Sequence, residues 1–252
     1  MFKQFRLTKP IQRTLTRFYH SSDHIGSNLI VNPNAIESKV LSKALEYVPK
    51  YGFTQVCITE AIRGLQYPDS LQSVITSNPR GNSAEFELVL HWLKCKRQEL
   101  EQYVINPSSE DFHKIGNEYE RASHLIKKRL LANEPIIEKL QSGLSQLVVP
   151  GNIPQSMEEL HNLSDDIAFY AGDKSNDFAW YSKRMGLSTV YVSSELFMLQ
   201  DTSEGFQRTQ DFVDEKVAGL KGLGSAYTNI EEWSVFNAIS LVNLIKSQLL
   251  RG

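Results

Sequence analysis

The sequence lacks most features that identify common sites and topologies. Its two cysteines, Cys57 and Cys95, have neither the spacing of a zinc site nor the density of a disulfide scaffold, so we expect both to be buried thiols. No stretch of about 18 uninterrupted apolar residues occurs, so a conventional membrane-spanning helix is not predicted. Alternating apolar and polar residues between hairpin turns are almost absent. The predicted fold class is therefore all-α.

The chain also lacks a large net charge, because its 27 Lys and Arg residues nearly balance its 29 Asp and Glu residues and leave a formal net charge of −2. This balance gives no general attraction to nucleic acid or to an anionic membrane. However, residues 1–19 hold five basic residues, no acid, and apolar residues at roughly helical spacing. This pattern predicts a mitochondrial transit peptide at 1–19, followed by a disordered linker at 20–33. A basic disordered arm is the alternative.

Apolar residues at spacings of three and four predict helices along the rest of the chain. Three short helices and a long one come first, near 34–48, 56–64, 69–76 and 83–103. Asn34 or Ser38 can cap the first, which is expected to end near Pro49. The order resembles the helix-turn-helix head and connecting helix of TetR-type regulators, so we expect a head at 34–80.

A helical body that binds a ligand and a partner is expected at 81–222. Its further helices are predicted near 111–117, 121–132, 135–148, 156–171, 177–200 and 205–220. The glycines between Lys221 and Ser225 indicate a hinge, so 223–252 is predicted to hold a hinge and an amphipathic helix. That helix is expected to dock on a membrane, with packing on its own domain as the alternative. Its docking residues would be Trp233, Phe236, Leu241, Leu244 and Ile245.

A DNA-reading head needs clustered cations, and the sequence has few there. Between Lys50 and Asn82 the only cations are Lys50, Arg63 and Arg80, and the helix near 69–76 has none. We therefore expect no binding of nucleic acid, although a TetR-type DNA-binding regulator is the alternative function.

Motifs for catalysis are equally scarce. Glu158 and His161 form one Glu-x-x-His motif, whereas di-iron bundles need two such motifs and two further glutamates. No Gly-x-Ser-x-Gly nucleophile motif is present, and the glycines at 219–224 follow a predicted helix rather than a strand. We expect no catalytic residues, no metal and no cofactor.

The most informative segment runs from Asp177 to Asp201. Trp180, Tyr181 and Arg184 suit an interface, and Arg184 could meet a phosphate or carboxylate at the mouth of a pocket. The apolar run at 196–199 could line that pocket. An ordinary core helix is the alternative on periodicity alone.

The residues of two stretches, Asp165 to Arg184 and Ser194 to Ser203, closely resemble the accessory lipid-binding protein family of coenzyme Q (ubiquinone) biosynthesis. Weaker similarity extends from about Ile36 to Lys221. The resemblance implies a TetR-like fold without DNA binding, located peripherally on the matrix side of the mitochondrial inner membrane. It also implies a non-catalytic protein that binds polyprenylated quinone intermediates and phospholipid. It would assist the demethoxyubiquinone hydroxylase and the wider synthesis complex, and we expect a homodimer.

Site residues follow from the same resemblance. The partner-binding residues would be Asp177, Trp180, Tyr181 and Arg184. The lipid-binding residues would be Arg184, Met185, Leu196, Phe197 and Met198, with Arg184 associated with phospholipid head groups. We expect the first group to face outward and the run at 196–199 to face the core or a pocket.

Overall fold

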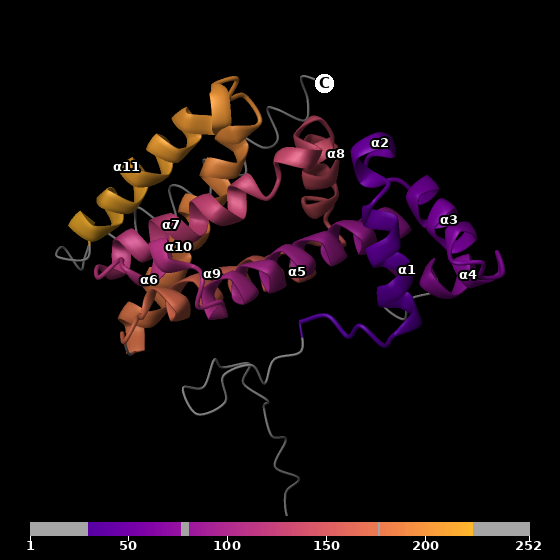
Figure 1. Cartoon of the computed structure of the whole chain (residues 1–252), viewed down its shortest axis with the longest axis horizontal. Helices are drawn as coiled ribbons and strands as arrows, with labels where there is room; N and C mark the ends of the chain where they lie inside the picture. The colour runs from indigo at the N-terminus through magenta and orange to yellow at the C-terminus, as the bar shows by residue number, and fades with distance from the viewer. Residues whose placement is uncertain (1–29, 77–80, 176, 224–252) are drawn as a thin grey trace, which may run out of the picture.

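The computed structural model describes residues 30–76, 81–175 and 177–223, and within them every regular element is a helix (Figure 1). The all-α prediction is confirmed. The elements, with two short 3-10 helices labelled η, are α1 (Ile36–Leu45), α2 (Val48–Tyr51), α3 (Gln55–Gly64), α4 (Leu71–Thr76), α5 (Ala84–Ile105), α6 (Glu110–His113), α7 (Glu118–Leu131), η1 (Glu134–Ile136), α8 (Ile137–Leu147), α9 (Ile153–Ala171), α10 (Asp177–Met198), η2 (Glu204–Phe206) and α11 (Gln207–Leu223).

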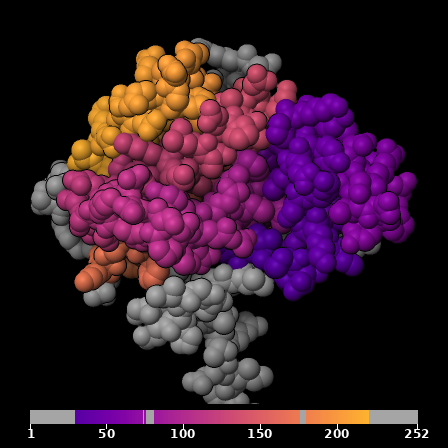
Figure 2. Space-filling model, viewed as in Figure 1, coloured from indigo at the N-terminus to yellow at the C-terminus, as the bar shows by residue number. Residues whose placement is uncertain are grey.

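The head is formed by α1 to α4, which pack around the first half of α5 at one end of the molecule (Figure 2). Two expectations about its first helix were wrong. Its N-cap residue is Ala35, which offers no side-chain acceptor, so neither Asn34 nor Ser38 caps it. The helix also ends at Leu45, and Pro49 lies in the first turn of α2, where the missing N–H of proline costs no helical hydrogen bond.

The long helix α5 joins the head to the body (Figure 1). It begins at a Ser83 cap, whose Oγ accepts from the Phe86 N–H at 3.2 Å, and Glu85 and Glu87 lie favourably in its first turn. Its early residues, including Trp92, belong to the head core, and Leu100 belongs to the body core. The two cores therefore share one rigid element.

The body consists of α7, α9, α10 and α11, of which α7 and α9 pack against α5, and α8 packs against α5 and α2. Close approaches at glycines set two of its contacts. A Cβ at Gly143 of α8 would lie 2.7 Å from two ring atoms of Phe53 in the head. A Cβ at Gly186 of α10 would lie 2.8 Å from a methyl of Leu220 in α11. The small residues let these helices pack at these distances.

Several predicted segments lie outside the described residues. They are the transit peptide at 1–19, most of the linker at 20–33, and the docking residues Trp233, Phe236, Leu241, Leu244 and Ile245. The predicted hinge needs one correction, because α11 continues through Leu223. In the segments that the structure covers, no helix is both long and apolar enough to cross a membrane.

Candidate functional site

The amino-terminal half of α10 presents an aromatic surface. Tyr181 is 65% exposed, and its ring packs edge-on against the half-buried Trp180 ring, with centroids 4.7 Å apart and an interplanar angle of 78°. Met185, one turn later, is also exposed. His161 of α9 lies beside Trp180, with ring centroids 6.0 Å apart. We call Trp180, Tyr181, Met185 and His161 the Trp180 surface. The side chain of Asp177 is not among those described.

Arg184 lies beneath this surface rather than on it. Only 5% of the residue is exposed, and its guanidinium carbon lies 3.8 Å from the centroid of the Trp180 ring. Its Nε donates to Asp165 Oδ1 at 2.5 Å, and its Nη1 donates to Asp173 Oδ2 at 2.8 Å and to the Trp180 carbonyl at 3.2 Å. The expectation that Arg184 faces outward was therefore wrong, because two carboxylates satisfy its donors inside the protein.

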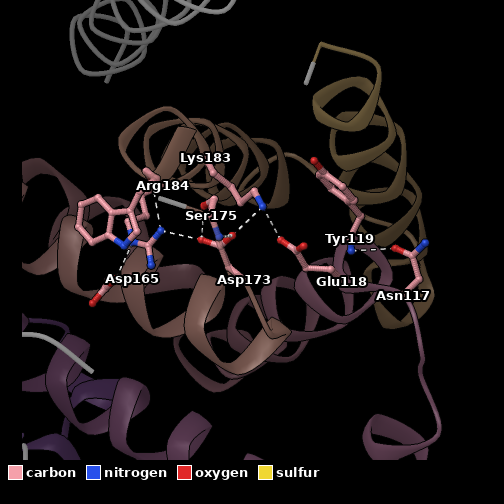
Figure 3. Close-up of polar contacts among 9 residues, drawn as sticks. Asn117, Glu118, Tyr119, Asp165, Asp173, Ser175, Lys183 and Arg184 are labelled. Atoms are coloured by element: carbon pink, nitrogen blue, oxygen red, sulfur yellow. Dashed lines mark hydrogen bonds and ion pairs between the residues drawn. The ribbon is translucent and has the colours of Figure 1, made fainter. Parts of the chain in front are cut away.

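Asp173 is the second anchor of this arrangement. It accepts hydrogen bonds from Arg184, from Ser175, and from Lys183 at 2.7 Å, while Lys183 also donates to Glu118 of α7 at 2.7 Å (Figure 3). Burial raises the pKa of Asp173, but these hydrogen bonds outweigh it and lower the pKa to about 2. The carboxylate is therefore ionised at neutral pH and connects the loop after α9 to α10, while Lys183 connects α10 to α7.

Gly172 explains why Asp173 lies where it does. It ends α9 with φ of 91°, a left-handed conformation that glycine adopts without the strain of a Cβ. The Gly172 and Asp173 N–H groups then donate to the Phe169 and Ala168 carbonyls, each at 3.0 Å. This C-cap turns the chain back and brings the Asp173 carboxylate to α10.

The predicted pocket residues at the end of α10 are largely packed inside. Leu196 is 9% exposed, and Met198 is fully buried in the body core. The Phe197 ring stacks on Phe212 of α11, with centroids 4.7 Å apart and an interplanar angle of 4°. The predicted lipid-binding residues therefore do not lie together, because residues 196–198 are packed inside and Met185 is on the Trp180 surface.

A depression of about 440 Å³ lies elsewhere in the body, between α7 and α11. Asp214 of α11 lines it and accepts hydrogen bonds from two α7 residues, Ser123 Oγ at 2.6 Å and Lys127 Nζ at 2.5 Å. His124 also lines it, with a pKa lowered by burial and by neighbouring lysines. None of residues 196–198 lines this depression.

Trp180 and Tyr181 were predicted from the sequence as interface residues, but the residues that hold them in place were not predicted. Asp165 and Asp173 flank the end of α9, and nothing in the spacing shows that both turn toward Arg184. A glycine directly before Asp173 was the available signal, because it predicts a helix end with a reversal of the chain. In the segments that the structure covers, no cluster of three or more His, Cys, Asp or Glu could hold a metal ion.

Comparison with known proteins gives consistent matches. The COQ9 family profile matches residues 153–224, the region of α9 to α11. The chain is 36% identical to the Saccharomyces cerevisiae protein named "Ubiquinone biosynthesis protein COQ9, mitochondrial", covering 94% of this chain and 95% of that protein. The Schizosaccharomyces pombe protein of that name is 30% identical over 98% of this chain and 94% of its own length.

A solved structure supports the fold in addition. A TetR transcriptional regulator from Nitrosomonas europaea superposes with a TM-score of 0.54 at 14% identity, covering 72% of this chain and 95% of that chain. At this identity the likeness shows the fold alone. It confirms the prediction of a TetR-like helical bundle.

Proposed function

Because the chain belongs to the COQ9 family of mitochondrial ubiquinone biosynthesis proteins, we propose that it acts there as a non-catalytic accessory protein. In this role it binds polyprenylated quinone intermediates and presents them to the demethoxyubiquinone hydroxylase. The observation that carries the proposal is the Trp180 surface, in which the half-buried Trp180 and the exposed Tyr181 pack together above the buried ion pairs of Arg184.

The Trp180 surface suits the hydroxylase as partner because its aromatic side chains are preorganised. Exposed aromatic residues supply large contact areas, and a fixed ring loses little conformational entropy on binding. Arg184 fixes the Trp180 ring from below, so we now assign it to positioning that ring rather than to contact with a phospholipid head group.

The test of this contact is Trp180→Ala, measured by calorimetric titration with the purified hydroxylase. Truncating an interface hot spot costs about 2 kcal/mol or more, a roughly 30-fold weaker affinity. Tyr51→Ala is the matched control, since Tyr51 is another exposed aromatic residue but belongs to the head. Unchanged affinity of the Trp180 variant would remove this surface from the proposal.

The lipid part of the proposal has its own test. Burial of each methylene of a polyprenyl tail contributes roughly 0.8 kcal/mol, so a long tail can bind with few polar contacts. Solvent extraction of the purified protein, followed by mass spectrometry, should recover prenylated quinone intermediates or phospholipid in stoichiometric amounts. Their absence from protein prepared without detergent would count against lipid binding.

Attachment to the matrix face of the inner membrane is assigned to the predicted helix that includes Trp233, Leu241 and Ile245. Flotation with vesicles should recover the full chain, and Leu241→Asp together with Ile245→Asp should reduce that recovery because charged side chains do not enter the apolar layer. Equal flotation of both proteins would exclude this helix as the anchor. The homodimer stays a prediction, which analytical ultracentrifugation can test.

A further inference from the structure

Exposed apolar side chains gather along α9 and the start of α10. Among the described residues, nine large apolar side chains are exposed, and five of them lie on these two helices or directly before them: Val149, Ile153, Met157, Tyr181 and Met185. Single exposed apolar residues are ordinary on a protein, but a group of them on one face marks an interaction site. Tyr181 and Met185 belong to the Trp180 surface, and the other three have no role in the site described above.

These three residues form one row. They are spaced four apart, and the Ile153 N–H donates to the Val149 carbonyl at 3.2 Å, so Val149 lies one helical turn before Ile153. Residues four apart on a helix project from the same side. The exposed fractions of Ile153 and Met157 are 45% and 58%. We call Val149, Ile153 and Met157 the α9 stripe.

The α9 stripe leads to the Trp180 surface. His161 follows Met157 by four residues, is exposed, and lies beside Trp180, with ring centroids 6.0 Å apart. From Ile153 to His161 the helix rises about 12 Å. The Trp180 ring in turn packs against Tyr181. The two surfaces are therefore one continuous strip that runs along α9 and onto α10.

A partner docked on the Trp180 surface needs more area than that surface supplies. A specific interface buries about 800 Å² on each partner. An aromatic side chain has roughly 150–250 Å² of surface, and only part of each side chain in the Trp180 surface is exposed. The interface must therefore extend. The neighbouring Lys183 already pairs with Glu118 and Asp173, whereas covering the α9 stripe removes apolar surface from water.

Charge favours a protein over a bilayer as the occupant of the stripe. From Val149 to His161 the sequence has no Lys or Arg, and Glu158, directly after Met157, is exposed. Faces that dock on membranes combine apolar residues with cations that meet anionic lipids. An exposed acid without any cation does not suit such a face.

Backbone geometry favours a helix as the contacting element. The stripe lies along the start of α9 (Ile153–Ala171), where the helix uses its own backbone groups and leaves no edge to which a strand could pair. Contact is therefore made by side chains. A row of side chains one turn apart fits between the side-chain rows of another helix.

We propose that the α9 stripe docks an amphipathic helix of the protein that contacts the Trp180 surface. The apolar residues of that helix, at spacings of three and four, lie along the stripe. This proposal rests on the partner-binding function above and adds a second contact region and the kind of element that covers it.

The experiment is calorimetric titration of the full chain and its variants with the purified hydroxylase. Ile153→Glu together with Met157→Glu should weaken the affinity by about 10-fold or more, because the partner would bury two carboxylates without counterions. Val56→Glu is the matched control, since Val56 is 48% exposed and lies in the first turn of α3 in the head. The control should bind like the wild type. Wild-type affinity in the double variant overturns the proposal.

Thermal unfolding shows whether the double variant keeps its fold. Its Tm should stay close to that of the wild type, since exposed substitutions usually change stability by about 0.5 kcal/mol or less. If the Tm falls, Ile153→Gln together with Met157→Gln takes its place and should weaken the affinity several-fold without adding charge. Unchanged affinity in that folded variant also overturns the proposal.

A crosslink identifies the contacting element directly. The photo-crosslinking residue p-benzoylphenylalanine, in place of Met157, should form a covalent adduct with the hydroxylase in the illuminated complex. Mass spectrometry should locate the adduct in a segment with helical apolar periodicity. An adduct confined to a loop, or no adduct, overturns the proposal.

The remaining outcomes separate this proposal from the function on which it rests. If the wild-type chain does not bind the hydroxylase, the partner-binding function fails and the inference fails with it. If Trp180→Ala weakens binding and the double variant does not, the function stands and the inference is overturned.

Two assays of the double variant without the hydroxylase test the other occupants. Reduced flotation with vesicles of phosphatidylcholine and cardiolipin would assign the stripe to a bilayer. A changed sedimentation coefficient of the chain alone would assign it to a second copy. Either result overturns the proposal, whereas wild-type behaviour in both assays supports it.

Discussion

The buried ion pairs of Arg184 allow a prediction that separates the structure from the first expectation for this residue. Arg184→Met removes the cation but keeps an apolar side chain under Trp180. It removes the ion-pair partner of Asp165 and one of the two cations that pair with Asp173, whose side chain is only 1% exposed. Breaking a buried ion pair costs about 3–5 kcal/mol. Since Lys183 still pairs with Asp173, we expect the lower end, about 3 kcal/mol.

That loss has a measurable size. For a chain of this length, each kcal/mol corresponds to a Tm change of about 2–4 °C, so Arg184→Met should unfold about 6–12 °C lower. Circular dichroism at 222 nm follows the transition, and urea unfolding gives the free energy. Tyr181→Ala, which removes an exposed side chain of the same surface, should change stability by less than about 0.5 kcal/mol.

The result that refutes this reasoning is an Arg184→Met variant as stable as the wild type. If that variant also lost affinity for the hydroxylase, Arg184 would contact the partner directly, as the sequence alone had indicated. If stability and affinity fall together, and Arg184→Lys recovers only part of both, the side chain acts by positioning Trp180. Lysine keeps the charge but cannot bond two carboxylates and stack on the ring at once.

Three other predictions concern stability. Burial lowers the pKa of His91 from 6.5 to about 4, so on acidification the unfolded chain binds the proton before the folded protein does. About 3 kcal/mol of stability should therefore be lost between pH 7 and pH 4. The same change of the urea midpoint with pH in the wild type and in His91→Asn would contradict this prediction. Gly143→Ala should be destabilised by about 1–2 kcal/mol through the clash with a core ring, whereas Gly219→Ala, with no neighbour within 4 Å, should gain up to about 1 kcal/mol; equal Tm values would contradict the packing argument. Met198→Ala should lose about 2–5 kcal/mol in urea unfolding because its side chain is fully buried, and the exposed Met185→Ala should lose little; similar losses would mean that Met198 does not belong to the core.

Periodicity predicted most of the helices, because it reflects which face of each helix is removed from water. The helix predicted near 56–64 is α3 (Gln55–Gly64), and the one predicted at 83–103 is α5 (Ala84–Ile105). Helix boundaries near prolines were harder to predict. Pro49 both disfavours a continuing helix and suits the first turn of a new one, and only the packing of α2 decides between these roles.

The sequence by itself determined the all-α fold, the helical segments and, through two continuous stretches of residues, the family. It also predicted that Trp180 and Tyr181 belong to an interface, and this stays a prediction. The orientation of Arg184 was decided only by tertiary structure. A helical arginine beside a tryptophan can extend into solvent or turn inward, and the free energy of turning inward depends on buried carboxylates. Asp165 and Asp173 supply them from α9 and the loop that Gly172 turns back, a contact that no local spacing encodes.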